Sequence, residues 1–80
     1  MYQKDQKITG VYFGISFHGT INCVEPNWEI GSRNAVNIYV SLDTEMKLFG
    51  MRRNSLALLG VNPLTGKHFN RVKNWEIDPS

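Results

Sequence analysis

The chain has 80 residues, of which 41% are hydrophobic, 20% charged and 11% aromatic, and its formal net charge is +2. This length predicts a single domain, residues 1–80, which buries only about 60% of its unfolded surface. Cys23 is the only cysteine, which excludes an internal disulfide and favours a reducing, cytoplasmic location. Residues 1–7 are polar, and no run approaches the roughly 18 apolar residues of a membrane span, so we expect a frayed lead-in and no membrane partner.

The first predicted element is a β-strand over residues 8–17, where β-branched and aromatic residues alternate with others. His18-Gly19 is either the turn of a hairpin leading into residues 20–24 or part of one bent strand. Pro26 has no amide hydrogen for a ladder, so it ends this element. Three glycines spaced through the stretch predict sharp bends or the close approach of another backbone, namely Gly10, Gly14 and Gly19.

Residues 35–42 predict a second clear strand, because their apolar side chains alternate with polar ones. The side expected to face the core consists of Val36, Ile38, Val40 and Leu42.

Two structures are compatible with residues 43–60. Good helix formers and a capping residue at 43 or 44 allow a helix around 44–59. Gly50 in the middle, and a turn-forming Asn-Pro-Leu-Thr-Gly at 62–66, favour short strands instead, with strands at 55–61 and 67–75 on either side of that turn.

The favoured fold is therefore all-β, a strongly bent barrel or sheet of five or six strands. In length, short strands and glycine-marked bends it is similar to SH3-like and OB-like small barrels, an analogy of architecture alone. The alternative is an α+β fold with one helix across a sheet.

An internal repeat relates residues 21–30 to residues 69–77, which share six identical positions when one gap is allowed. We interpret it as two equivalent strand-and-turn elements that deliver matching side chains to one core, with both tryptophans mostly buried. The predicted repeat core consists of Ile21, Val24, Trp28, Ile30, Phe69, Val72, Trp75 and Ile77.

Catalysis has no positive support in the sequence, so we expect a protein that is not an enzyme and has no cofactor or metal. An enzyme would need several polar groups to converge in one cleft. Cys23 has no recognisable motif around it and is expected to be a buried structural cysteine. Two or three of the following would have to converge: His18, Cys23, Asp43, Glu45 and His68.

The charge is uneven, because residues 46–75 contain six basic side chains and no acidic one. Such asymmetry predicts a binding module with an acidic partner, and nucleic acid is the first candidate. In a β-strand over 67–73, three of these cations and Phe69 would share one face. Such a face suits single-stranded nucleic acid, whose phosphates contact cations and whose bases stack on aromatic rings. A scattered, solvated basic face is the other interpretation. The six predicted binding residues are Lys47, Arg52, Arg53, Lys67, Arg71 and Lys73.

A second functional hypothesis is a protein-interaction or inhibitory module, which includes association of the chain with itself as a homo-oligomer. Nine aromatic residues in so small a domain should leave some rings at the surface, where tryptophan and tyrosine act as interface anchors. Open strand edges would favour pairing with a second copy. An acidic protein surface is the alternative to nucleic acid as the partner of the basic residues.

Overall fold

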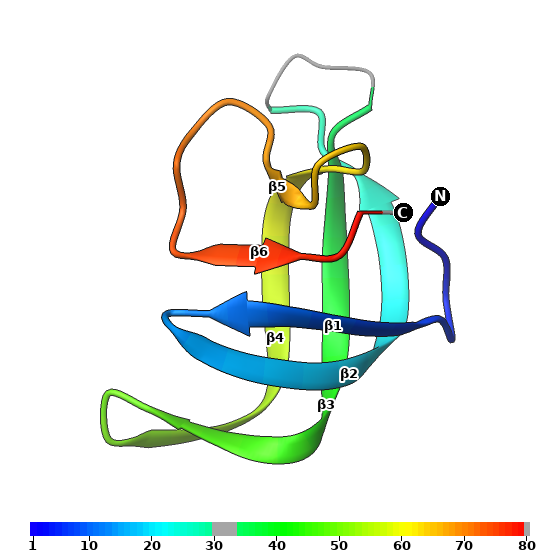
Figure 1. Ribbon diagram of the computed structural model, residues 1–80. Helices are drawn as coiled ribbons and strands as arrows, with labels where there is room; N and C mark the ends of the chain where they lie inside the picture. The colour runs from blue at the N-terminus through cyan, green and yellow to red at the C-terminus, as the bar shows by residue number, and fades with distance from the viewer. Residues whose placement is uncertain (30–33, 80) are drawn as a thin grey trace.

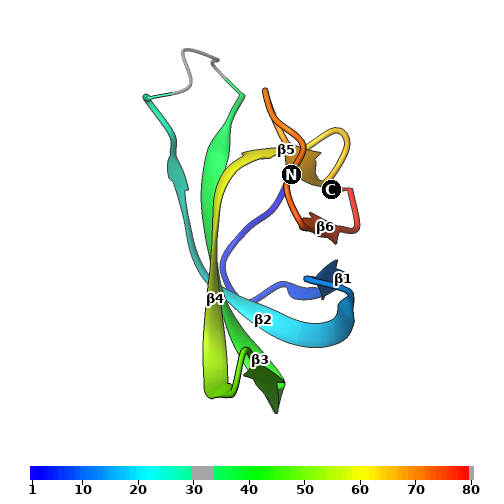
Figure 2. The ribbon, with the colours of Figure 1, turned by 90° about the vertical axis from the view of Figure 1, so that its left-hand side faces the viewer.

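Six antiparallel strands form one sheet that curls into a nearly closed barrel in the computed structural model, which describes residues 1–29 and 34–79 (Figures 1 and 2). The strand order is β5-β4-β3-β2-β1-β6. The strands are β1 (Lys7–Tyr12), β2 (Ile15–Pro26), β3 (Val36–Leu48), β4 (Met51–Asn62), β5 (Lys67–His68) and β6 (Trp75–Ile77). The all-β prediction is confirmed.

The helix considered for residues 44–59 is wrong, because these residues complete β3 and build most of β4. Burial along β4 has a period of two, not of 3.6. Leu56 and Leu58 are buried, whereas Ala57 and Leu59 between and beyond them are exposed. The predicted turn at 62–66 does connect two strands, and the predicted inward face of residues 35–42 is confirmed by the burial of Ile38 and Val40.

The first predicted strand is in fact a hairpin. Tyr12 pairs with Ile15, so the chain turns at residues 13–14, and β2 then runs without a break through His18 and Gly19. Of the two alternatives for 18–19, the bent strand is therefore the confirmed one. A Cβ on Gly19 would come within 2.5 Å of the Val40 side chain, which confirms the predicted close approach of a neighbouring strand.

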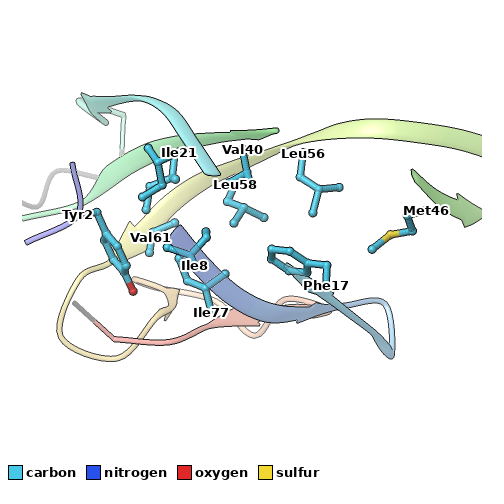
Figure 3. Close-up of a cluster of buried hydrophobic side chains, with 11 residues drawn as sticks. Tyr2, Ile8, Phe17, Ile21, Val40, Met46, Leu56, Leu58, Val61 and Ile77 are labelled. Carbon is cyan, nitrogen blue, oxygen red and sulfur yellow. The ribbon is translucent and has the colours of Figure 1, made fainter. Parts of the chain in front are cut away.

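The core fills the interior of the curled sheet, where side chains from five strands meet (Figure 3). Ile38, Leu58 and Val61 from β3 and β4 are completely buried there, and Ile77 from β6 joins them from the opposite wall. Each such side chain contributes about 1.5–3 kcal/mol by leaving water. Because β6 supplies a core residue, the last strand is part of the fold rather than an appendage.

The N-terminal residues are ordered against the barrel, so the prediction of a frayed lead-in over 1–7 is wrong. Tyr2 is only 7% exposed, and its hydroxyl donates a hydrogen bond to the carbonyl oxygen of Asp78. Burial, and then the charge of Asp78, raise the pKa of Tyr2 to about 12, so the hydroxyl keeps its proton. The Asp5 amide also donates to the carbonyl of Ile21 at 2.8 Å, which fixes the backbone of this segment.

The repeat does not correspond to two equivalent elements, and that prediction is wrong. In the first copy a strand comes first and a turn follows, whereas in the second copy residues 69–74 form a connection and β6 follows. Trp28 therefore stands 81% exposed after Pro26, while Trp75 lies half-buried in β6. Val72 is fully exposed, and Ile30 lies outside the described residues. Of the other predicted core residues, Ile21 and Ile77 are buried, Val24 packs against the core and Phe69 is half-buried.

Candidate functional site

An open groove of about 920 Å³ lies between the tips of two hairpins and the connection 69–74. All three segments reach the left-hand side of the molecule in Figure 1. The lining of the groove is mostly apolar on the hairpin side and basic on the side of the connection. The residues that line it include Val11, Phe13, Leu48, Phe49, Lys67, His68, Arg71, Val72, Lys73, Trp75 and Glu76.

Both hairpin tips carry the same dipeptide, Phe-Gly, in the same backbone conformation. Phe13 has φ 50° and Gly14 φ 79°, and Phe49 has φ 51° and Gly50 φ 76°. Two central residues with positive φ are the mark of a type I′ turn, in which asparagine, aspartate or glycine is favoured at the first position. A bulky residue at that position costs on the order of 1–3 kcal/mol. This unfavourable conformation occurs twice in the chain, at Phe13 and at Phe49.

The two strained turns bring their aromatic rings together. The ring centroids of Phe13 and Phe49 are 5.5 Å apart, in an edge-to-face arrangement, and Phe13 also contacts the ring of Tyr12 at 4.9 Å. Phe49 is nevertheless 79% exposed, so core packing of its ring does not explain the turn at residues 49–50. The result is an aromatic surface at the mouth of the groove, which sequence reasoning missed. The repeated Phe-Gly dipeptide at the end of two alternating stretches was the signal for it.

The connection 69–74 forms the opposite side of the groove and is fixed by hydrogen bonds. His68 Nδ1 accepts the amides of Asn70 at 3.2 Å and Arg71 at 3.0 Å, which fixes the start of the connection. At its end, the Phe13 amide donates to the carbonyl of Asn74 at 2.6 Å. The side chains of Arg71 and Lys73 are thus presented from a fixed backbone, next to the Phe-Gly tips.

His68 is held in its neutral form by its surroundings. Burial lowers its pKa below the ordinary 6.5, and the positive charges of Lys73 and then Arg71 lower it further. Neutral His68 keeps a free lone pair on Nδ1 for the two amides that it accepts. An anion bound beside Arg71 and Lys73 would offset their charge, so the pKa of His68 reports on occupancy of the groove.

The structure brings three of the six predicted cations to the groove and leaves three outside its lining. Lys67, Arg71 and Lys73 line it, with Lys67 also 3.7 Å from the Glu76 carboxylate. The predicted row along a strand over 67–73 is wrong, because β5 ends at His68 and residues 69–74 form a connection instead of continuing the strand. The cations outside the groove lie on the β3–β4 hairpin and are Lys47, Arg52 and Arg53.

The polar groups considered for catalysis are mostly engaged elsewhere. Cys23 is exposed, so the prediction of a buried structural cysteine is wrong. A register shift between Ile21 and Cys23 turns its side chain outward. Asp43 lies 3.5 Å from Lys7, and Glu45 lies 3.5 Å from Arg52. Within residues 1–29 and 34–79, no group of three or more His, Cys, Asp or Glu side chains is placed to hold a metal ion.

Comparison with protein-family models, curated proteins and solved structures gave no match for this chain. In the part of the chain that the structure describes, no helix is long and apolar enough to cross a membrane.

Proposed function

We propose that the groove binds single-stranded nucleic acid and that the protein is a binding module rather than an enzyme. Exposed aromatic rings offer faces on which bases stack, and cations beside them contact the phosphates. The observation that supports this most strongly is the pair of Phe-Gly turns. Their strain is retained where an asparagine would relieve it, and strained non-glycine residues cluster at binding sites.

A single strand fits this surface better than a duplex. The rings of Phe13 and Phe49 lie at hairpin tips, where they can stack only on bases whose faces are free. The bases of a duplex are already stacked on each other, and the groove offers three cations rather than the long basic stripe that tracks two backbones.

Replacing Phe49 by asparagine tests this proposal, because binding and stability should change in opposite directions. Asparagine suits the first position of the turn, and the exposed Phe49 ring gives up little packing when it is removed. We expect the Phe49→Asn variant to be more stable by about 1 kcal/mol, which raises the Tm by about 4–8 °C in a domain of this size. Its affinity for a labelled oligothymidylate in low salt, measured by fluorescence anisotropy, should fall at least about fivefold.

Two outcomes would contradict the proposal. If the parent protein at micromolar concentration forms no complex with the oligonucleotide in low salt, the groove is not a site for single strands. If Phe49→Asn gains stability but binds as tightly as the parent, the aromatic surface takes no part in binding.

A second function, docking of a protein partner, is favoured by the apolar character of the hairpin tips. Val11, Phe13, Phe49 and Met51 are all exposed there, and they would form a docking surface for an apolar segment with acidic flanks or for a second copy of the chain. Light scattering of the free protein at high concentration tests whether a second copy docks there. A mass that stays that of the monomer would exclude this self-association.

The exposed thiol of Cys23 is consistent with work in a reducing compartment, and we propose the cytoplasm as the site of action. In an oxidising compartment, an unpaired and exposed cysteine would form disulfides between molecules.

A further inference from the structure

We infer that a bound strand continues from the groove across the connection 69–74 and stacks a further base on Trp28. This inference rests on the proposed function and extends the site from one side of the connection to the other. It makes Trp28, which the fold leaves outside the core, a binding residue for the same single-stranded nucleic acid.

A second hollow, of about 680 Å³, lies on the far side of the connection. Trp28 and Tyr39 supply its aromatic surface, and Glu29 is its acidic lining residue among the described part of the chain. Four residues line both this hollow and the groove, namely His68, Asn70, Arg71 and Lys73. The connection is therefore a basic ridge between two hollows that each contain exposed aromatic rings.

Trp28 is exposed but its backbone is fixed. The preceding residue, Asn27, is only 9% exposed, and its amide donates to the carbonyl of Ala35 at 3.0 Å. The Asn27 side chain donates to Asn37 Oδ1 at 2.7 Å and accepts the amide of Glu29 at 3.0 Å. These bonds hold the turn on both sides of the tryptophan.

Such an arrangement is what a stacking platform requires. A ring that is 81% exposed contributes little to the core, and a fixed backbone reduces the entropy that is lost when a ligand binds. Asn37 Oδ1 also accepts the Gly60 amide at 3.1 Å, so the turn is tied to β4 as well as to β3. The polar groups around Trp28 thus hold it in place without covering it.

The arrangement of the elements allows one strand of nucleic acid to reach both hollows. The connection 69–74 and the adjoining ends of β2 and β3 lie at the same end of the barrel in both views (Figures 1 and 2). Arg71 and Lys73 can neutralise phosphates where the nucleic acid crosses the connection 69–74. Bases can then stack on the Phe-Gly tips on one side of the connection and on Trp28 on the other.

The test compares oligothymidylates of about 4 and about 12 nucleotides, a range that spans the site sizes of small single-strand binders. In low salt, we expect Trp28→Ala to weaken binding of the longer strand at least about fivefold and to change binding of the shorter strand little. Leu64→Ala is the matched control, because Leu64 is 77% exposed and lines neither hollow. It should bind both lengths as the parent does.

The outcomes separate the inference from the function on which it rests. If the parent binds neither length, both the proposed function and the inference are wrong. If the parent binds the longer strand and Trp28→Ala binds it as tightly as Leu64→Ala does, the groove is a site for single strands but the second hollow is not part of it. Trp28 is largely exposed, so both variants should keep the parent's thermal stability, and this is checked by thermal unfolding.

Discussion

Reversing two charges on the connection, Arg71→Glu with Lys73→Glu, should weaken binding of an oligothymidylate by about 100-fold or more in low salt. Both side chains line both hollows, so the variant loses two phosphate contacts. The two introduced carboxylates also repel the phosphates of the nucleic acid where it crosses the connection 69–74. Losing two contacts also lowers the slope of log affinity against log salt by about 1.4. Both residues are exposed, so the free energy of unfolding should change by no more than about 0.5 kcal/mol.

The same variant should raise the pKa of His68, because the charges of Lys73 and Arg71 are among the causes that lower it. An NMR titration of the His68 ring measures this shift and shows that the charges act where the structure places them.

A matched control is the double variant Arg52→Glu with Arg53→Glu, which reverses the same number of charges on the β3–β4 hairpin. These residues lie outside the lining of the groove, and Arg52 is already 3.5 Å from the Glu45 carboxylate. We expect this control to lose much less affinity. An equal loss in the two double variants would mean that the overall charge of the domain, and not the connection, determines binding.

Replacing Gly66 by alanine should destabilise the protein by about 3 kcal/mol or more, and lower its Tm by more than about 10 °C. Gly66 has φ 73°, and a Cβ there would overlap the carbonyl oxygen of Ile77 and lie 2.8 Å from its carbonyl carbon. This contact is where the barrel nearly closes. The Ile77 amide donates to the carbonyl of Gly66 at 2.9 Å, so β6 cannot move away without losing that bond.

Gly50→Ala is the control for Gly66→Ala, because it separates backbone strain from the clash. Gly50 has nearly the same φ, 76°, but a Cβ there would meet no atom within 4 Å. It should cost only about 1–2 kcal/mol, the usual penalty for a side chain in the left-handed region. Thermal unfolding that shows equal losses in the two variants would contradict the structural role given to the Gly66–Ile77 contact.

The fold was predictable where local pattern and burial agree. Residues 35–42 alternate cleanly, so their inward face followed from the sequence, and the turn residues at 62–66 marked a chain reversal. The first hairpin was missed because Phe-Gly is an uncommon dipeptide for a type I′ turn, and residues 8–17 otherwise alternate without interruption. Trp28 was misplaced because a short loop after Pro26 holds it outside the core, and its hydrophobicity alone does not determine its burial.

The candidate site was only partly predictable. The excess of cations in residues 46–75 pointed to Lys67, Arg71 and Lys73, but could not separate them from the cations of the β3–β4 hairpin. That separation depends on the pairing of β1 with β6, in which Gly10 lies opposite Ile77. A contact between residues so distant in the chain has no local sequence signal, and it is this contact that brings the connection 69–74 beside the Phe-Gly tips.

Binding of single-stranded nucleic acid in the groove can be located residue by residue by an NMR titration of the labelled protein with an oligothymidylate of about 12 nucleotides in low salt. We expect the amide signals of Phe13, Phe49 and residues 68–75 to shift most, while those of Arg52 and Arg53 shift little. Shifts concentrated on the β3–β4 hairpin arms, or no shifts at all, would contradict the claim that the groove binds single-stranded nucleic acid.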